Sequence, residues 1–269
     1  MGEIAGTNMK TNAVKIGNIE IGGDRVVTIA GPCSVESLEQ FQQTALFTQE
    51  HGATLLRGGL FKLRTRPDSF QGLGVAGFSI VEDVKTQTQM PYISEITDTR
   101  QVEELNDVVD AFQVGSRNMH NYALLKELGQ TDKPVLLKRG FSGLIDEWLH
   151  SADYIVNGGN ENVILCERGI RTFETKTRNT FDINAIAYVK QFSSFPVIAD
   201  PSHGTGMREL VIPVALASIA AGADGLIVEV HPNPAEAKSD GYQALTFEDF
   251  QQLMNQVKKI EPIIKRNHC

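Results

Sequence analysis

Eight short apolar runs, each followed by a stretch with helical character, recur along this chain and constrain its fold more than any other feature. A parallel strand buried on both faces has such a continuous apolar sequence, and a crossover helix then returns the chain to the next strand. The runs cover residues 26–30, 54–57, 92–95, 111–114, 135–138, 163–166, 197–200 and 226–230. Eight such units predict a (β/α)₈ barrel, which typically takes ~250 residues.

The helical pattern is clearest at the end of the chain. Apolar residues recur there at intervals of three or four, at Phe247, Phe250, Leu253, Val257, Ile260 and Ile264. This spacing places them on one face of a helix over residues 246–264. Thr246 and Asp249 have the spacing of a capping box, which marks the first turn of a helix.

A doubly wound open sheet is the alternative arrangement for the same alternation of strands and helices. Such a sheet usually has a glycine-rich dinucleotide-binding turn after its first strand. This chain has Gly31-Pro32-Cys33 at that place, which is unlike such a turn. The barrel is therefore the favoured arrangement.

The first 21 residues do not follow the repeating pattern. Residues 13–21 alternate around Gly17-Asn18, which predicts a short β-hairpin. Residues 1–12 have no apolar periodicity, and we expect a flexible tail. No Pro/Gly/Ser-rich linker divides the later units, so we expect a single catalytic barrel over residues 13–269, hairpin included, with no regulatory domain.

Composition argues against several classes of protein. The chain has 33 acidic and 25 basic residues and a net charge of −8, which disfavours binding to a nucleic acid backbone. The longest apolar run, residues 210–221, contains a proline and is shorter than the ~20 residues that span a bilayer. No basic-then-apolar signal stretch begins the chain. Cys33, Cys166 and Cys269 are odd in number and far apart, which predicts a reducing cytoplasm.

Cationic side chains concentrate at the predicted carboxyl ends of the strands, the face of a barrel that carries catalytic groups. Nine of the 25 basic residues lie there, namely Arg57, Lys62, Arg64, Arg66, Arg117, Lys138, Arg139, Arg168 and Arg171. So many cations around one opening repel one another unless an anionic ligand neutralises them. We therefore expect small phosphorylated or carboxylated substrates. Arg66, Arg139 and Arg171 are equally consistent with solvated loop charges.

A second set of side chains comes together only if the barrel closes. Cys33 follows the first strand of the predicted barrel, His203 follows the seventh, Glu229 lies in the eighth, and Asp240 lies in the last long loop. A thiolate, an imidazole and two carboxylates suit a divalent transition metal rather than Mg²⁺. The spacing is not a compact metal motif, so a small core cysteine is the alternative interpretation of Cys33.

Five separated motifs carry a resemblance to a known family. They are Gly31-Pro32-Cys33-Ser34-Val35-Glu36-Ser37, Leu56-Arg57-Gly58-Gly59, Ser69-Phe70-Gln71-Gly72-Leu73-Gly74, Gln113-Val114-Gly115-Ser116-Arg117-Asn118 and Asp200-Pro201-Ser202-His203-Gly204. In this order they resemble the type I-beta branch of 3-deoxy-D-arabino-heptulosonate 7-phosphate (DAHP) synthases, over roughly residues 13–260. The resemblance implies a (β/α)₈ barrel that condenses phosphoenolpyruvate with erythrose 4-phosphate in the first step of the shikimate pathway. It also implies a homodimer or homotetramer.

The resemblance implies roles for single residues. The family's ligands for one divalent transition metal (Mn²⁺, Fe²⁺, Co²⁺ or Zn²⁺) correspond to Cys33, His203, Glu229 and Asp240. Its phosphoenolpyruvate-binding groups correspond to Arg57, Lys62, Arg117, Lys138, Arg168 and the backbone N–H of Ser116. The loop that holds the aldose phosphate reads Lys62-Leu63-Arg64-Thr65, which keeps Arg64 and Thr65. Leu63 replaces the family's proline, so the loop loses a fixed φ angle.

Three other functions remain as alternatives. The sister family makes 3-deoxy-D-manno-octulosonate 8-phosphate from arabinose 5-phosphate and resembles the chain at residues 31–33. That family typically has Lys-Ala-Asn-Arg at positions 62–65 and lacks the pattern at residues 115–118, so the four-carbon aldose is favoured. A non-catalytic barrel that binds a phosphorylated metabolite and an aldolase with a Schiff base on Lys138 are the others.

A proton-transfer role is expected for Glu95, with Lys138 or His203. The three residues stand at predicted strand ends, where they can handle the proton of the water that attacks C2 of phosphoenolpyruvate. A carboxylate near several cations has a lowered pKa and stays ionised, as a base requires. Because 269 residues leave no room beside the barrel for a regulatory domain, we expect weak or no inhibition by aromatic amino acids.

Overall fold

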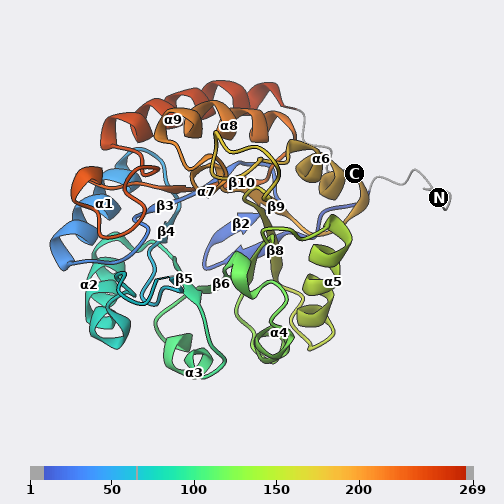
Figure 1. Ribbon diagram of the computed structural model, residues 1–269, viewed down its shortest axis with the longest axis horizontal. Coiled ribbons are helices and arrows are strands. Elements are labelled where there is room, and N and C mark those ends of the chain that lie inside the picture. The colour runs from blue at the N-terminus through green and yellow to red at the C-terminus, as the bar shows by residue number, and fades with distance from the viewer. Residues whose placement is uncertain (1–8, 65, 265–269) are drawn as a thin grey trace.

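The computed structural model describes residues 9–64 and 66–264 and contains a closed barrel of eight parallel strands (Figure 1). The strands are β3 Val27–Gly31, β4 Leu55–Arg57, β5 Tyr92–Ile96, β6 Ala111–Val114, β7 Val135–Lys138, β8 Val163–Glu167, β9 Val197–Ala199 and β10 Gly225–Glu229. Each pairs with the next along the chain, and β10 pairs with β3 to close the sheet. The predicted (β/α)₈ fold is confirmed, and each predicted run matches its strand to within one residue at either end.

Helices cover the outside of the barrel as a ring (Figure 1). They are α1 Leu38–Glu50, α2 Phe78–Thr88, α3 Gln101–Asn106, α4 Tyr122–Leu128, α5 Ile145–Val156, α6 Ile183–Phe192, α8 Arg208–Ala220 and α9 Phe247–Ile260, whereas the short α7 Pro201–Thr205 lies at the carboxyl end of β9. Their buried faces and the outward side chains of the strands form one continuous apolar core. Within the described part of the chain, no helix has the length and apolar character needed to cross a membrane.

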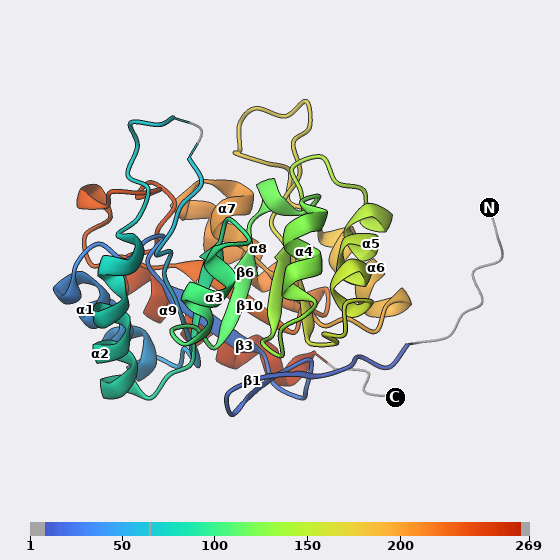
Figure 2. The ribbon, with the colours of Figure 1, turned by 90° about the horizontal axis from the view of Figure 1, so that it is seen from below.

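A two-stranded hairpin closes the amino-terminal end of the barrel, as predicted. β1 Val14–Ile16 pairs antiparallel with β2 Ile19–Ile21, and Gly17 adopts a left-handed φ of 59° in the turn. The hairpin packs against inward-facing side chains of the barrel strands, in a cluster that includes Ile29, Leu55, Ile93, Leu136, Ile164, Ile198 and Ile227. Figure 2 shows the hairpin below the strands. We call this apolar cluster the floor.

The two ends of the chain only partly test the predictions made for them. α9 begins after the Thr246–Asp249 capping box, whose two backbone–side-chain hydrogen bonds measure 3.1 and 3.2 Å. The helix was predicted to reach residue 264 but ends at Ile260. Pro262 cannot continue the α-helical hydrogen bonds, and a 3₁₀ turn, Glu261–Ile263, follows instead. Of the predicted tail, residues 1–8 lie outside the described residues.

Trp148 joins helix α5 to strand β7. Its side chain is fully buried, and its indole N–H donates to the carbonyl of Leu137 at 3.1 Å. The guanidinium of Arg139 lies 6.0 Å from the indole ring. The aromatic ring and its one polar atom are therefore both satisfied inside the wall of the barrel.

Candidate active site

The loops that follow the barrel strands enclose a cavity of about 240 Å³ at the carboxyl end of the barrel. The loops after β4 and β8 rise above the strand ends in Figure 2, and both contribute to the cavity wall. The wall includes ten of the predicted site residues: Arg57, Lys62, Arg64, Glu95, Ser116, Arg117, Lys138, Arg168, His203 and Asp240. Thr65 lies outside the described residues. We call this end of the barrel the mouth.

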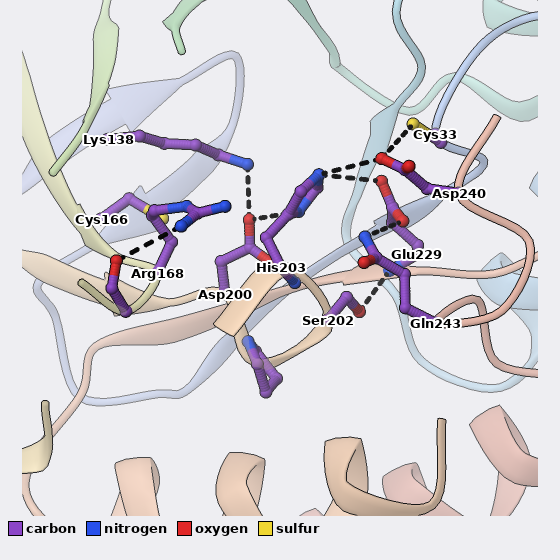
Figure 3. Close-up of polar contacts among 12 residues, drawn as sticks. Cys33, Lys138, Cys166, Arg168, Asp200, Ser202, His203, Glu229, Asp240 and Gln243 are labelled. Carbon is purple, nitrogen blue, oxygen red and sulfur yellow. Dashed lines mark hydrogen bonds and ion pairs between the residues drawn. The ribbon is translucent and has the colours of Figure 1, made fainter. Parts of the chain in front are cut away.

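The four candidate metal ligands converge on one side of the mouth (Figure 3). One ligand atom from each of Cys33, His203, Glu229 and Asp240 lies within 4.8 Å of the others. His203 Nε2 lies 3.3 Å from Glu229 Oε1 and 4.0 Å from Asp240 Oδ2, and Cys33 Sγ lies 3.7 Å from Asp240 Oδ2. Tetrahedral ligands at zinc-like bond lengths are separated by about 3.3–3.8 Å. The arrangement therefore fits a small metal ion with little movement.

Asp200 orients the imidazole of His203. Helix α7 begins directly after β9, and the Asp200 carboxylate caps it by accepting from the backbone N–H of His203 at 3.0 Å. The same carboxylate lies 2.8 Å from His203 Nδ1. The geometry is not that of a standard hydrogen bond, but a carboxylate charge so close to Nδ1 favours the tautomer with hydrogen on Nδ1, which leaves the Nε2 lone pair for a metal. Burial lowers the pKa of His203, so the ring is neutral at pH 7, as a ligand must be.

Cys33 and Glu229 are buried beside this imidazole. Gln243 Nε2 donates to Glu229 Oε2 at 2.7 Å, whereas Oε1 is buried without a hydrogen-bond donor and has Arg57 Nη1 at 3.1 Å. A buried carboxylate oxygen that accepts no hydrogen bond keeps its lone pairs for a cation. Burial, with Glu229 nearby, raises the pKa of Cys33 to about 12. A metal ion is what stabilises a thiolate in such a place, so the donor set fits a divalent transition metal.

The backbone and two arginines hold Asp240 in position. Its φ is 51°, in the left-handed region that non-glycine residues seldom adopt outside functional sites. Arg178 Nη1 lies 3.6 Å from Oδ2, and Arg64 Nη1 lies 4.0 Å from Oδ1. Burial alone would raise the pKa of Asp240, but His203 and Arg178 lower it to about 2. The carboxylate is therefore ionised and ready to bind a cation.

The other side of the mouth carries buried cations. Lys138 Nζ pairs with Asp200 Oδ2, so its charge is balanced. Arg168 is buried and donates to the carbonyl of Gly169 at 3.3 Å, but no carboxylate among residues 9–64 and 66–264 forms an ion pair with it. Burial, with Arg178 nearby, lowers its pKa to about 10. A buried guanidinium without a counter-ion is stabilised by an anionic ligand.

The ring of Phe141 contacts three guanidinium groups at the edge of this cluster of cations. The carbon atoms of the Arg117, Arg168 and Arg171 guanidiniums lie 5.4, 4.9 and 4.5 Å from the ring centroid. Each distance is within the range of a cation–π contact. Phe141 also lines the cavity and thereby holds Arg117 and Arg168 at its wall.

Glu95 lies between the two sides of the mouth. Lys62 Nζ is 3.3 Å from Glu95 Oε2. A Cβ at Gly115 would come within 2.1 Å of Glu95 Oε1, so only glycine lets this carboxylate lie against the loop that carries Ser116. Burial disfavours the charge of Lys62, but Cys33 and Glu95 outweigh it and raise the pKa. Lys62 therefore stays cationic.

Known proteins match this chain over nearly its whole length. A sequence model of the DAHP synthetase I family matches residues 7–266. The chain belongs to the DAHP synthetase I family. The phospho-2-dehydro-3-deoxyheptonate aldolase of Thermotoga maritima is 47% identical to it over 247 residues, which cover 92% of this chain and 73% of that protein.

Solved structures of this DAHP synthetase I relative share the barrel. The crystal structure of the Thermotoga maritima DAHP synthase matches with a TM-score of 0.92 and 46% identity, over 96% of this chain and 76% of that one. A truncated form of the same synthase matches with a TM-score of 0.88 and 43% identity, over 96% and 95%. The 2-dehydro-3-deoxyphosphooctonate aldolase of Geobacter sulfurreducens is more distant, at 31% identity over 95% of this chain and all of that protein.

Two of the nine cations expected around one opening, Arg139 and Arg171, lie outside the cavity wall of this DAHP synthetase I chain. Arg139 points away from the cavity and forms ion pairs of 2.9 Å with Glu167 and with Asp182. Lys138 and Arg139 are consecutive, so their side chains leave the strand on opposite faces. Arg66 pairs with Asp68 and is solvent-exposed, but it lies in the wall of the cavity, as expected. Arg171 is exposed and contacts Phe141.

Four residues of the mouth were not predicted to have a role in the site. Arg178 reaches Asp240 from the loop before α6 and donates to Gln243 at 2.7 Å, and Asp200 orients His203 as described. Phe141 had no predicted role, although its ring holds Arg117 and Arg168 at the cavity wall. Asp200 directly follows β9 and stands three residues before His203, and this position could have identified it, because a ligand histidine usually donates to a group such as a carboxylate. Arg178 and Gln243 lie in irregular loops that give no such indication.

Proposed function

We propose that the mouth of the barrel is the active site for the family reaction. The chain catalyses the aldol-type condensation of phosphoenolpyruvate with erythrose 4-phosphate, which gives DAHP and phosphate at the start of the shikimate pathway. Membership of the DAHP synthetase I family and 47% identity to the Thermotoga maritima enzyme support this reaction. The observation that carries the site is that a four-residue metal-ligand set and a buried, unneutralised arginine share one end of the barrel.

One divalent transition metal is proposed to bind Cys33, His203, Glu229 and Asp240, as Mn²⁺, Fe²⁺, Co²⁺ or Zn²⁺. The mixed sulfur, nitrogen and oxygen donors support this class of ion. When bound, the metal supplies a Lewis acid that polarises the aldehyde oxygen and stabilises its developing negative charge.

Phosphoenolpyruvate is proposed to bind the cationic side of the mouth. Arg168 lacks a carboxylate partner in the described chain, so a phosphate or carboxylate completes it, and Phe141 holds Arg117 beside the same place. The backbone N–H of Ser116 and the side chains of Arg57, Lys62 and Lys138 complete the proposed set. These contacts fix C3 toward the aldehyde, which replaces a random encounter by a positioned one.

The aldose phosphate is proposed to bind Arg64 and Thr65 at the rim of the mouth. Arg64 lies in the wall of the cavity, 4.0 Å from a carboxylate oxygen of the metal-ligand candidate Asp240. A phosphate held there places the aldehyde end of erythrose 4-phosphate toward the metal-ligand set.

Glu95 is proposed to accept the proton of the water that attacks C2, with Lys138 or His203. C3 of phosphoenolpyruvate forms a bond to the aldehyde carbon, whose oxygen takes up a proton, while the oxygen of water adds at C2. The bond between C2 and the phosphate oxygen then breaks, the C2 hydroxyl loses its proton to give the ketone, and inorganic phosphate leaves. Glu95 lies in the wall of the cavity, 3.3 Å from Lys62, which places its carboxylate beside the space proposed for the substrates.

The cellular context belongs to the same proposal. We propose a cytoplasmic homodimer or homotetramer that acts on small molecules rather than on nucleic acid or membranes. Cys33 and Cys166 are free thiols, as a reducing compartment requires. A single catalytic barrel with weak or no inhibition by aromatic amino acids stays a prediction.

A comparison of two aldoses tests the proposed function. Phosphoenolpyruvate consumption is measured with erythrose 4-phosphate and, separately, with arabinose 5-phosphate, before and after EDTA treatment and readdition of Mn²⁺. We expect faster consumption with the four-carbon sugar, loss of activity in EDTA and recovery with Mn²⁺. Preference for arabinose 5-phosphate would assign the sister activity to the chain. Full activity in excess EDTA would contradict the proposed role of the metal.

A further inference from the structure

The loop after β4 contacts the loop after β10 at the residue before a metal-ligand candidate. Arg64 Nη1 donates a hydrogen bond to Ser239 Oγ at 2.7 Å. A second contact joins the same two loops, since Lys238 Nζ lies 5.3 Å from the centroid of the Phe70 ring. The loop proposed to hold the aldose phosphate is therefore attached to the loop that carries Asp240.

The hydroxyl of Ser239 lies between Arg64 and the sulfur of Cys33. Ser239 is 3% exposed, and its Oγ is 3.1 Å from Cys33 Sγ. A guanidinium can only donate, so Ser239 Oγ accepts from Arg64 and keeps one hydrogen of its own. A metal-bound thiolate can only accept. The only consistent direction is a chain of hydrogen bonds from Arg64 to Ser239 and from Ser239 to the Cys33 sulfur.

We propose that Ser239 is a positioning residue that donates a hydrogen bond to the Cys33 thiolate, and that the sugar phosphate bound at Arg64 is sensed at the metal through this hydroxyl. The inference rests on the proposed function, because it takes Cys33 as a metal ligand and Arg64 as a phosphate ligand. It adds a residue and a connection between the two sites that the family reaction does not itself require.

The physical basis is polarisation along the chain of hydrogen bonds. A hydroxyl that accepts from a cation is a stronger donor, so Arg64 strengthens the bond from Ser239 to sulfur. That bond withdraws electron density from the thiolate and orients it toward the metal. A phosphate that takes the Arg64 N–H groups weakens the chain, and the sulfur then donates more strongly to the metal.

Substitution of the metal by Co²⁺ allows the metal–thiolate bond to be monitored by absorption spectroscopy. The Co²⁺-loaded protein has a thiolate-to-cobalt charge-transfer band in the near ultraviolet, whose energy falls when the thiolate loses a hydrogen bond. We expect Ser239→Ala to shift the band to longer wavelength. It should also raise the Kd for Co²⁺ about tenfold, because the lost orientation of the thiolate outweighs its stronger donation. Ser239→Thr keeps the hydroxyl and restores the band. Arg64→Ala should give a smaller shift in the same direction.

Ligand addition tests the second half of the proposal. Erythrose 4-phosphate added without phosphoenolpyruvate should shift the wild-type band toward that of Arg64→Ala, and should shift the band of Ser239→Ala little. Inorganic phosphate, added separately, shows whether the phosphate group alone is sufficient. Two matched controls come from the same loop, Arg66→Ala and Ser69→Ala, which remove a guanidinium and a hydroxyl without a contact to sulfur; neither should move the band.

The outcomes separate this inference from the proposed function. An unshifted band in Ser239→Ala overturns the positioning role while Cys33 remains a ligand. A shift in Ser239→Ala without any response to either phosphate overturns the connection to the aldose site. A band that is missing from the wild type, or one that survives in Cys33→Ala, overturns the metal assignment itself, and the role of Ser239 falls with it.

Discussion

The floor and the mouth lie at the two ends of the same eight strands, but the floor buries apolar side chains and the mouth buries charged ones. At the floor, hairpin residues such as Ile16 meet Ile29 and Ile164 in a cluster with no charged side chain. At the mouth, Arg168, Lys138 and Glu229 are equally buried but carry charge. Apolar burial contributes roughly 25 cal/mol per Å² to stability, whereas burying an ion costs several kcal/mol unless partners compensate. The floor therefore contributes to the free energy of folding, whereas the side chains of the mouth are arranged for binding ligands at a cost in stability.

Among these variants, Cys33→Ala should have the largest effect on kcat and should disrupt the mouth without disrupting the floor. Loss of a ligand removes the Lewis acid, which is worth several kcal/mol, so kcat should fall about 1000-fold or more. Metal content and turnover measure this, and thermal unfolding should show a change of about 1 kcal/mol at most. Cys166→Ala is the matched control, because that thiol is equally buried but lies in the floor cluster; it should retain the metal.

Ile16→Ala should break the floor alone. Truncation of a fully buried isoleucine lowers the free energy of unfolding by about 2–5 kcal/mol. Denaturant titration measures the loss, and kcat under native conditions should be unchanged. Lys15→Ala, on the exposed face of the same strand, should change stability by about 0.5 kcal/mol or less. If Ile16→Ala impaired catalysis in the folded protein, the two ends would not be separable.

Arg168→Ala should separate binding from stability within the mouth. Loss of a charge-assisted hydrogen bond costs about 1.5–3 kcal/mol, so KM for phosphoenolpyruvate should rise about 10- to 100-fold. Thermal stability without ligand should not fall, because a buried charge without a carboxylate partner is removed. Arg139→Ala is the contrasting variant, since it leaves Glu167 and Asp182 without their partner and should lower the melting temperature. Equal destabilisation by both variants would contradict this account of Arg168.

Phe141→Leu should have the smallest effect. Each cation–π contact is worth about 0.5–1 kcal/mol at a partly exposed site, so KM for phosphoenolpyruvate should rise about 3- to 10-fold with kcat nearly unchanged. Phe141→Tyr keeps the ring face and should restore KM. If the tyrosine variant were as impaired as the leucine variant, the ring would not be what holds Arg117 and Arg168.

The strands of the barrel were predictable because their signal is local. A strand such as β7 is covered on both faces, so its apolar run ends where the polar mouth begins, at Lys138. The direction of single side chains was less well predicted. Arg139 was counted with the mouth by its place in the chain, although the period of two along a strand already places it opposite Lys138.

Side-chain chemistry predicted from the sequence the four candidate metal ligands that the structure brings together, but not the groups that position them. Cys33, His203 and Glu229 stand at or just beyond strand ends, where a closed barrel must bring them near one another. Arg178 and Ser239 lie in loops, where no period relates chain position to direction. Their contacts depend on how two distant loops meet, and only the three-dimensional structure contains that information.

The buried indole of Trp148 gives the chain an optical reporter of its own. It is the single tryptophan of the sequence, bonded to the carbonyl one residue before Lys138. Its fluorescence therefore comes from one known place in the barrel wall, with no background from other indoles. Emission at short wavelength indicates that the indole is shielded from water, and a red shift indicates that water has reached it. The unfolding of every variant above can therefore be followed by the fluorescence of Trp148, without an attached dye.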